Sequence, residues 1–388
     1  MSQILVKNIG LLVTNNPSLG STQLGILKNA ALLAENGQIT WVGDSQSAPT
    51  AQNVIDADGK CVIPGFVDSH THLIFAGDRS NEFSARMAGQ SYAAGGIADT
   101  VTKTRAATDD DLLANANRLM HESLHSGTTT IEVKSGYGLT VIDEERSLKI
   151  AKQLTPETTF LGAHVVPSEF KAKSNDYVDL VCGQMLNQAK PYAKWIDVFC
   201  DRGAFTPEQG RKILTAGIAA GLKPRIHANQ LEQGDAVALA VELGCASVDH
   251  LTYFNQSDIE KLANSKTVAT LLPGAEFSTR SKYPDARKLI DAGITVAIAS
   301  DCNPGSSYTT SMPLMIALAV REMFFTPEQA LWSATKGGAL ALQREDVGHL
   351  SIGAKADFVI LRESSYIHLA YRPGVNLVEQ VFLHGKSI

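Results

Sequence analysis

Short apolar runs alternate with stretches of helical periodicity through the middle of the chain. The stretch Asp109–Ser126 shows the helical pattern, because its large apolar residues recur on one face. Eight runs have the length and composition of buried strands: Cys61–Val67, Thr128–Val133, Thr159–Val166, Lys194–Cys200, Lys223–His227, Ala246–Leu251, Thr267–Leu272 and Ile294–Ser300. Strands that alternate with helices predict a parallel sheet with helical crossovers.

Two helices have clear starts. Thr206-Pro207-Glu208-Gln209 and Thr326-Pro327-Glu328-Gln329 each combine an N-capping Thr, a Pro at the first helical position and a Gln that completes a capping box. No glycine-rich phosphate loop of the Rossmann or P-loop type follows any predicted strand. Eight strand–helix units therefore favour a (β/α)8 TIM-type barrel over an open doubly wound sheet, with the active site at the carboxyl ends of its strands.

The two ends of the chain have a different pattern. Gln3–Val6, Leu24–Leu27 and Ile39–Val42 near the start are β-prone, as are Phe358–Leu361 and Val378–Leu383 near the end. Neither end has enough apolar residues for a core of its own. We therefore expect a small composite β-sandwich domain from residues 1–60 and 346–388, beside a catalytic barrel from residues 61–345.

Composition narrows the function classes. The chain has 388 residues, of which 44% are hydrophobic and 19% charged, and its net charge of −6 comes without a basic run. This balance argues against nucleic acid as a partner, because phosphate binding needs a concentrated basic face. The five cysteines form no C-x-x-C pair, and no apolar run is long enough to span a membrane. We expect a cytoplasmic protein with a small-molecule substrate.

Histidines gather at the ends of the predicted strands. These are His70, His72, His164, His227 and His250, whereas His121, His125, His349, His368 and His384 lie in helices or in the terminal domain and are assigned no role.

One group of strand-end residues predicts a metal site. His70 and His72 are two residues apart, so in an extended strand both side chains point to one face. His227, His250 and Asp301 end three later strands, and an Asp buried directly after an apolar strand is costly unless it is paired or binds a metal. Imidazoles and a carboxylate around one barrel mouth predict a zinc-type site with an open coordination position.

Several longer strings carry a family resemblance. The stretch from Pro64 to His72, the later single histidines, Asp301 and the closing Gly353–Val359 resemble the amidohydrolase superfamily. Within it, Glu132–Leu139, Leu161–His164 and Asp301–Ser306 resemble the imidazolonepropionase family of histidine degradation. The resemblance covers nearly the whole chain.

The resemblance implies a reaction and a ligand set. His70, His72, His227 and Asp301 would hold one Zn or Fe ion per chain, which activates a water that attacks the ring carbonyl of 4-imidazolone-5-propanoate and yields N-formimidoyl-L-glutamate. Asp301 would also move the proton of that water, and His250 would hydrogen-bond the water or the oxyanion. Lys134 would not be a ligand, because the one-metal subtype needs no bridging lysine.

The resemblance also implies a substrate-binding set: Arg79, Tyr92, Tyr137, His164, Gln230, Asn303, Gly305 and Ser306. Gln230 has a particular weight, and we count it among the catalytic candidates with His250 and Asp301. Ring deaminases of the superfamily usually carry Glu at this place to protonate a ring nitrogen, which an amide cannot do. Gln230 therefore favours the opening of a cyclic amide.

Two alternatives remain open at this point. The chain could be a deaminase of an aminated heterocycle, which Gln230 and the Ser135–Gly138 string argue against. It could also be a catalytically inactive relative that serves as an assembly module, which the intact set of four ligands argues against. The sequence is compatible with a homodimer but does not establish one.

Overall fold

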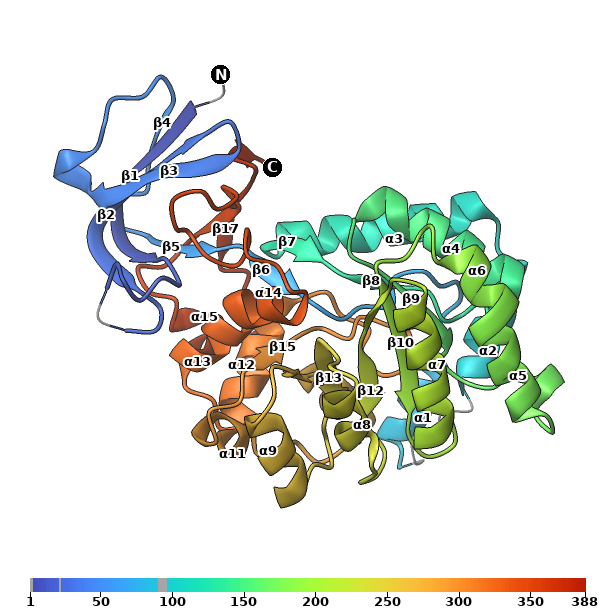
Figure 1. Ribbon diagram of the computed structural model, residues 1–388. Coiled ribbons are helices and arrows are strands. Elements are labelled where there is room, and N and C mark those ends of the chain that lie inside the picture. Colours follow the sequence, from blue (N-terminus) through green and yellow to red (C-terminus); the bar gives the residue numbers. More distant parts are fainter. Residues whose placement is uncertain (1–2, 21, 90–95) are drawn as a thin grey trace. The chain divides into compact units, whose positions relative to one another are not determined.

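The computed structural model describes residues 3–20, 22–89 and 96–388 (Figure 1). The chain forms two compact units. The terminal unit contains residues 1–69, 121–130 and 311–388, and the barrel unit contains residues 70–120 and 131–310. The domain boundaries predicted above stay a prediction, since these units assign residues 61–69, 121–130 and 311–345 to the side of the termini.

One mixed sheet forms most of the terminal unit. Its hydrogen-bonded order is β18-β17-β16-β5-β1-β2-β3, and β4 pairs with β1. The strands are β1 (Gln3–Val13), β2 (Ile26–Glu35), β3 (Gln38–Asp44), β4 (Val54–Asp56), β5 (Cys61–Pro64), β16 (Phe358–Leu361), β17 (Val378–Leu383) and β18 (Lys386–Ser387).

Both ends of the chain contribute to the core of this sheet. Residues 36 and 37 join β2 to β3 with positive φ angles of 52° and 83°, the conformation that an Asn-Gly hairpin turn adopts. Val6 and Leu32 from the first strands share one buried cluster with Phe358 and Phe382 from the last strands. The composite domain predicted from the sequence is therefore confirmed.

The prediction for Cys61–Val67 as one barrel strand is wrong. The run divides at Gly65, so that Cys61–Pro64 joins the terminal sheet, while β6 (Phe66–Asp68) pairs with β7 (Thr128–Ile131). Close packing explains the break: a Cβ on Gly65 would lie 2.1 Å from the Thr129 hydroxyl oxygen, and the Gly65 amide donates to the Asp357 carbonyl at 2.9 Å. Only glycine fits there.

A parallel sheet forms the centre of the barrel unit. Its order is β8-β9-β10-β12-β13-β14-β15, with β11 paired to β10, and it contains the six predicted runs from Thr159–Val166 to Ile294–Ser300. The prediction of Thr128–Val133 as one strand is wrong, because β7 pairs with β6 and only β8 belongs to this sheet. The strands are β8 (Val133–Lys134), β9 (Thr158–Ala163), β10 (Trp195–Cys200), β11 (Lys223–Pro224), β12 (Ile226–Ala228), β13 (Ser247–His250), β14 (Val268–Leu271) and β15 (Val296–Ile298).

The segment 70–72 connects the two edges of this parallel sheet. The Lys134 amide donates to the Thr71 carbonyl at 3.0 Å on one side. On the other side, the amide of Asp301 donates to the carbonyl of His70 at 3.0 Å, and the amide of His72 donates to Cys302 at 2.9 Å. The sheet therefore curls round and brings the first and last strand ends together, as a TIM-type barrel requires.

Helices follow the strands, and both predicted capping boxes are present, at Thr206 and at Thr326. The helices are α1 (Ser80–Met87), α2 (Ile97–Ala106), α3 (Asp109–His125), α4 (Val141–Leu154), α5 (Ser174–Leu180), α6 (Leu186–Ala189), α7 (Pro207–Ala219), α8 (Ala236–Glu242), α9 (Gln256–Ala263), α10 (Pro273–Thr279), α11 (Ala286–Asp291), α12 (Met312–Glu322), α13 (Pro327–Trp332), α14 (Gly338–Ala341) and α15 (His368–Tyr371). Shorter helical turns are Ser45–Ser47, Ser168–Phe170, Val181–Met185 and Ser333–Gly337. None of the helices among the described residues is long and apolar enough to cross a bilayer.

Replacing Phe382 by Ala tests the shared core of the terminal unit. Its ring stacks on Phe358 with centroids 4.3 Å apart, and both side chains are fully buried. We expect Phe382→Ala to lower the free energy of unfolding by about 3–5 kcal/mol in denaturant titrations. Ile352→Ala, at a side chain that is 69% exposed, is the control and should change it by less than about 0.5 kcal/mol. Equal effects of the two variants would contradict this core.

Candidate active site

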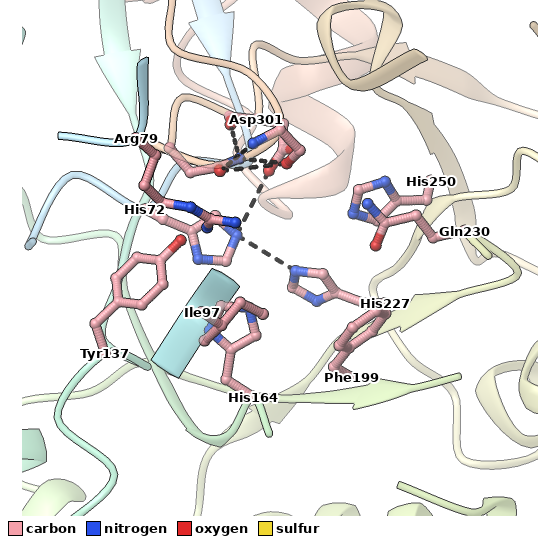
Figure 2. Close-up of a pocket in the computed structure, with 12 residues that line it drawn as sticks. His72, Arg79, Ile97, Tyr137, His164, Phe199, His227, Gln230, His250 and Asp301 are labelled. Carbon is pink, nitrogen blue, oxygen red and sulfur yellow. Dashed lines mark hydrogen bonds and ion pairs between the residues drawn. The ribbon is translucent and has the colours of Figure 1, made fainter. Parts of the chain in front are cut away.

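A cavity opens at the carboxyl ends of the parallel strands (Figure 2). It is lined by His72, Arg79, Ile97, Tyr137, His164, Phe199, His227, Gln230, His250, Asp301, Asn303 and Ser306. Most residues predicted from strand ends and from the resemblance thus lie around one cavity. Tyr92 lies outside the described residues.

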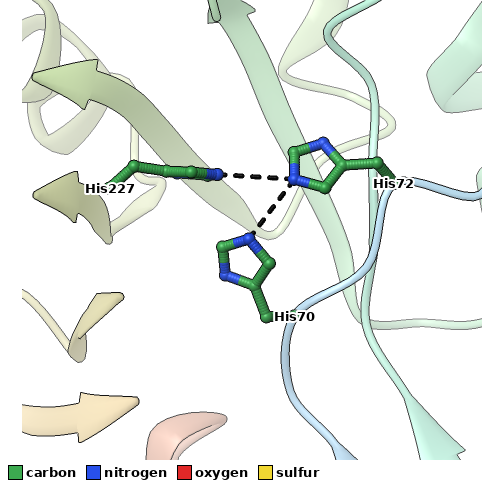
Figure 3. A group of neighbouring side chains, drawn as sticks. All are labelled: His70, His72 and His227. Atoms are coloured by element: carbon green, nitrogen blue, oxygen red, sulfur yellow. Dashed lines mark hydrogen bonds between the residues drawn. The ribbon is translucent and has the colours of Figure 1, made fainter. Parts of the chain in front are cut away.

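Three buried imidazoles converge beside this cavity (Figure 3). The Nε2 atoms of His70 and His72 are 3.3 Å apart, and those of His72 and His227 are 3.4 Å apart. Asp301 Oδ1 lies 3.6 Å from His70 Nε2 and 3.5 Å from His72 Nε2. These four residues are the predicted ligand set, and the donor atoms of His70, His72 and His227 all lie within 4.8 Å of one another.

The spacing of the donor atoms fits a metal ion. Four ligand atoms arranged tetrahedrally around zinc at bond lengths of about 2.1 Å lie roughly 3.4 Å from one another. The separations between His72 and each of His70 and His227, and between Asp301 and each of His70 and His72, are 3.3–3.6 Å and match that value. A second group of possible ligands, His70, His250 and Asp301, has donor atoms within 4.8 Å of each other. The two groups share His70.

Two carboxylates orient the imidazoles of His70 and His227 by contacting their Nδ1 atoms. Asp249 Oδ2 lies 2.7 Å from His70 Nδ1, and Asp197 Oδ1 lies 3.1 Å from His227 Nδ1. A carboxylate at Nδ1 keeps the proton there, so Nε2 is left with its lone pair facing the centre. The sequence-based interpretation missed both carboxylates.

A buried ionic network holds those carboxylates in turn. The ammonium group of Lys134 lies 3.0 Å from Glu132 and 2.9 Å from Asp197, and all three side chains are inaccessible to solvent. Arg225 donates to Asp249 at 3.1 Å. Because Lys134 is held as a cation between two acids, its contacts agree with the prediction that it is not a ligand.

The protonation states suit metal binding. Burial lowers the pKa of His70 and His72 well below the ordinary value, and neighbouring positive or titratable groups, including Lys134, lower it further. Burial likewise lowers the pKa of His250, and it lowers that of His164 to about 3. The imidazoles are therefore neutral near pH 7, which is the form that binds metal ions.

The pKa of Asp301 is shifted in the opposite direction, upward. Burial raises the pKa of its carboxyl well above the ordinary value, although hydrogen bonds from Ser306 and Asn303 oppose this. A carboxyl group in this state readily accepts a proton, which suits a group that must carry one during a reaction.

Two strand-end residues have unusual backbone angles. His250 has a φ of 83° and Asp301 a φ of 53°, in a region that residues with a Cβ rarely adopt. The surrounding hydrogen bonds maintain this strain, for example the one from the Asp301 amide to the His70 carbonyl. Such strain is commonly found where side chains must point into a functional site.

The loop after β15 is held by Asn303. Its side-chain oxygen accepts from the amides of Gly305 and Ser306, both at 2.8 Å, and its nitrogen donates to the Asp301 carbonyl at 2.6 Å. The Asn303 amide thus shapes the loop that presents Asp301, and a direct contact between Asn303 and substrate stays a prediction.

The loop that carries Tyr137 is held by Glu144. The buried Glu144 carboxylate accepts from the amides of Gly138 and Leu139, at 2.9 and 2.8 Å. His164 Nδ1 contacts the Gly136 carbonyl at 3.0 Å, which leaves its Nε2 as an acceptor. The rings of Tyr137 and His164 lie 5.2 Å apart on one side of the cavity.

Gln230 is positioned through its backbone. The amides of Gln230 and Leu231 both donate to the Asp201 carboxylate, at 2.7 and 3.0 Å. The side chain of Gln230 lines the cavity near His250 (Figure 2). No carboxylate stands at this position, as the sequence indicated.

Comparisons with known proteins agree with this geometry. A family model described as "Amidohydrolase family" matches residues 61–388. The chain belongs to the amidohydrolase family. This confirms the family that the strand-end residues indicated.

Relatives that align over almost the whole chain indicate a more specific similarity within the family. The imidazolonepropionase of Salinispora tropica is 61% identical over 387 residues, which cover 99% of this chain and 98% of that protein. The imidazolonepropionase of Mycolicibacterium smegmatis is 59% identical over 388 residues, with 100% and 98% covered. The crystal structure of the atrazine chlorohydrolase of Arthrobacter aurescens, complexed with zinc, matches with a TM-score of 0.73 at 18% identity, and the match covers 99% of this chain and 94% of that chain. That last likeness shows the fold.

A buried acid near the site predicts a pH dependence. Glu276 in α10 accepts a hydrogen bond from the Thr252 hydroxyl at 2.6 Å, and burial raises the pKa of its carboxyl from 4.5 to about 7. The folded protein keeps this proton, whereas the unfolded chain releases it above pH 4.5. Stability from this residue is therefore complete below pH 4.5 and is lost as the pH rises through 7.

Glu276→Gln removes this titration and keeps the hydrogen bond from Thr252. Between pH 4.5 and pH 7, we expect the wild type to lose up to about 3 kcal/mol of unfolding free energy relative to the variant. Denaturant titrations of both proteins across this range measure the difference. If the unfolding free energies of the two proteins changed equally with pH, the raised pKa of Glu276 would be contradicted.

Proposed function

We propose that the chain is an imidazolonepropionase. It adds water across the cyclic amide of 4-imidazolone-5-propanoate, and cleavage of the bond between the ring nitrogen and the carbonyl carbon gives N-formimidoyl-L-glutamate. The observation that carries this proposal is identity of 61% and 59% to two proteins of that name over almost the whole chain. The convergent donor atoms at the barrel mouth support it.

His70, His72, His227 and Asp301 would hold one Zn or Fe ion per chain. A divalent ion lowers the pKa of a bound water and polarises a carbonyl group. The donor set of three imidazoles and one carboxylate suits both metals, and the partners of His70 and His227 at Nδ1 favour binding through Nε2.

Asp301 and His250 carry the proton and the developing charge. Asp301 takes the proton of the attacking water and passes it to the departing ring nitrogen, so that the leaving group is neutral. His250 lines the same cavity from the end of β13 and hydrogen-bonds the oxygen on which negative charge develops. Its strained backbone directs the ring into the cavity.

The substrate would be bound by the remaining lining residues. Arg79 pairs with the propionate carboxylate, since its guanidinium lines the cavity and offers charge-assisted hydrogen bonds. Tyr137 and His164 contact the ring, the segment from Asn303 through Gly305 to Ser306 contributes polar groups, and Gln230 binds without donating a proton as an acid. Tyr92 keeps its predicted substrate role from the sequence alone.

The proposal also covers the partners of the protein and its location. The substrate is a small molecule, and the negative net charge argues against nucleic acid as a partner. A homodimer and a cytoplasmic location stay predictions.

Asp301→Asn tests the proposed chemistry. The amide keeps the shape of the side chain but cannot carry the proton, so turnover should fall by at least about a thousandfold while the fold is retained. The assay follows the ultraviolet absorbance of imidazolone propionate and identifies N-formimidoyl-glutamate by mass spectrometry. His227→Ala should abolish turnover and also lower the metal content. Full activity of Asp301→Asn would refute the mechanism.

Arg79→Ala tests carboxylate binding. Loss of the guanidinium removes an interaction made equally in the ground state and the transition state, so KM should rise about tenfold or more with a smaller change in kcat. Steady-state kinetics on the same substrate measure both. An unchanged KM would show that the propionate is bound elsewhere.

A further inference from the structure

Three charged side chains lie along one face of α1. Arg79 is the N-cap residue, Glu82 lies in the first turn and Arg86 in the last, and spacings of three and four residues place them side by side. Arg79 and Arg86 are buried, at 5% and 4% exposure, whereas the Glu82 side chain is 31% exposed. Only Arg79 lines the cavity, and the proposed function gives the other two no role.

Glu82 holds one edge of the Arg79 guanidinium. Arg79 Nε donates to Glu82 Oε2 at 2.9 Å, and Nη2 donates to Oε1 at 2.8 Å. A bidentate pair of this kind fixes the plane of the guanidinium as well as its position. Within the part of the chain that the structure describes, Glu82 takes Nε and Nη2, and the Nη1 group is left for another carboxylate.

Two glycines enclose the same guanidinium. A Cβ on Gly305 would lie 2.1 Å from Arg79 Nη1 and 2.7 Å from Cζ. A Cβ on Gly96 would lie 2.1 Å from Arg79 Nη2 and 2.2 Å from Glu82 Oε2. A Cβ at either place would force the guanidinium to move, so its present position in the slot between them depends on both residues being glycine.

Arg86 contacts both Gly305, on one side of this slot, and Glu82, the ion-pair partner of Arg79. Arg86 Nη2 donates to the Gly305 carbonyl at 2.7 Å, and Arg86 Nη1 lies 3.6 Å from Glu82 Oε1. It therefore connects α1 to the loop that follows β15. Two arginines and one glutamate also leave a net positive charge of one beside the cavity, which one substrate carboxylate would balance.

We propose that Arg86 is a positioning residue for carboxylate recognition: through Glu82 and the Gly305 carbonyl it fixes Arg79 with Nη1 presented to the substrate. The enzyme then selects ring substrates with a carboxylate arm over neutral analogues. This inference rests on the proposed function and extends it from Arg79 to the residues that set its orientation. If Arg86 only stabilised the fold, replacing it would not change the preference for the carboxylate substrate over its neutral analogue.

The test compares two substrates in Arg86→Met. One is imidazolone propionate, and the other is the corresponding propanamide, which has the same ring and no negative charge. We expect kcat/KM for the acid to fall about tenfold or more, chiefly through KM, and kcat/KM for the amide to change less than about threefold. Arg211→Met removes an exposed arginine that pairs with Glu242, and it is the control that should leave both values unchanged.

A double-mutant cycle separates positioning from direct binding. If Arg86 acts through Arg79, Arg86→Met should have no further effect on the ratio of the two substrates in an Arg79→Ala background. An unchanged ratio in the single variant, or an equal further loss in the double variant, would overturn the inference. If Arg86→Met does not fold, Glu82→Gln provides the same comparison at a partly exposed site. It should also lower the ratio of kcat/KM for the acid to kcat/KM for the amide.

Failure of the proposed function would be recognised separately. Wild-type protein that opens neither compound contradicts the imidazolonepropionase reaction. The inference is then decided by calorimetric binding of the same acid and amide. A preference for the acid that is lost in Arg86→Met supports it, and equal binding of both compounds by the wild type overturns it.

Discussion

The site depends on ion pairs that are wholly buried inside the barrel. Asp249 and Asp197 contact the Nδ1 atoms of His70 and His227, and these acids are in turn paired with Arg225 and Lys134. Buried charges are costly unless every partner is present, so loss of one member leaves another uncompensated. The imidazoles of His70 and His227 consequently have one tautomer and one orientation, with their Nε2 atoms preformed as ligands.

The balance of charge explains why a cation belongs at this place. Around the centre, Glu132, Asp197, Asp249 and Asp301 are acids, and Lys134 and Arg225 are the buried cations paired with them. When these six groups are ionised and the nearby Glu276 keeps its proton, two negative charges are left, and a divalent ion would neutralise them. Without an ion, burial favours the protonated form of Asp301. Metal binding and proton transfer at Asp301 are thus two consequences of one electrostatic arrangement.

Much of this could be predicted from the sequence, because strand periodicity and strand ends follow from local pattern. His70 and His72 at a spacing of two predicted the centre only together with His227, His250 and Asp301 at the ends of later strands. The substrate roles came only from the family resemblance. The break at Gly65 was missed because it depends on Thr129, which is far away in the sequence. The carboxylate partners were missed because they come from other strands, although a lone charge such as Asp197 within an apolar strand is a usable signal.

The most direct test of the central claim is anomalous diffraction from crystals of zinc-loaded protein. The account predicts one peak per chain, at about 2.0–2.2 Å from the Nε2 atoms of His70, His72 and His227 and from an oxygen of Asp301. A peak bound by His70, His250 and Asp301 without His72 and His227 would contradict it. So would coordination through Nδ1, because Asp197 and Asp249 would then not be orienting the ligands.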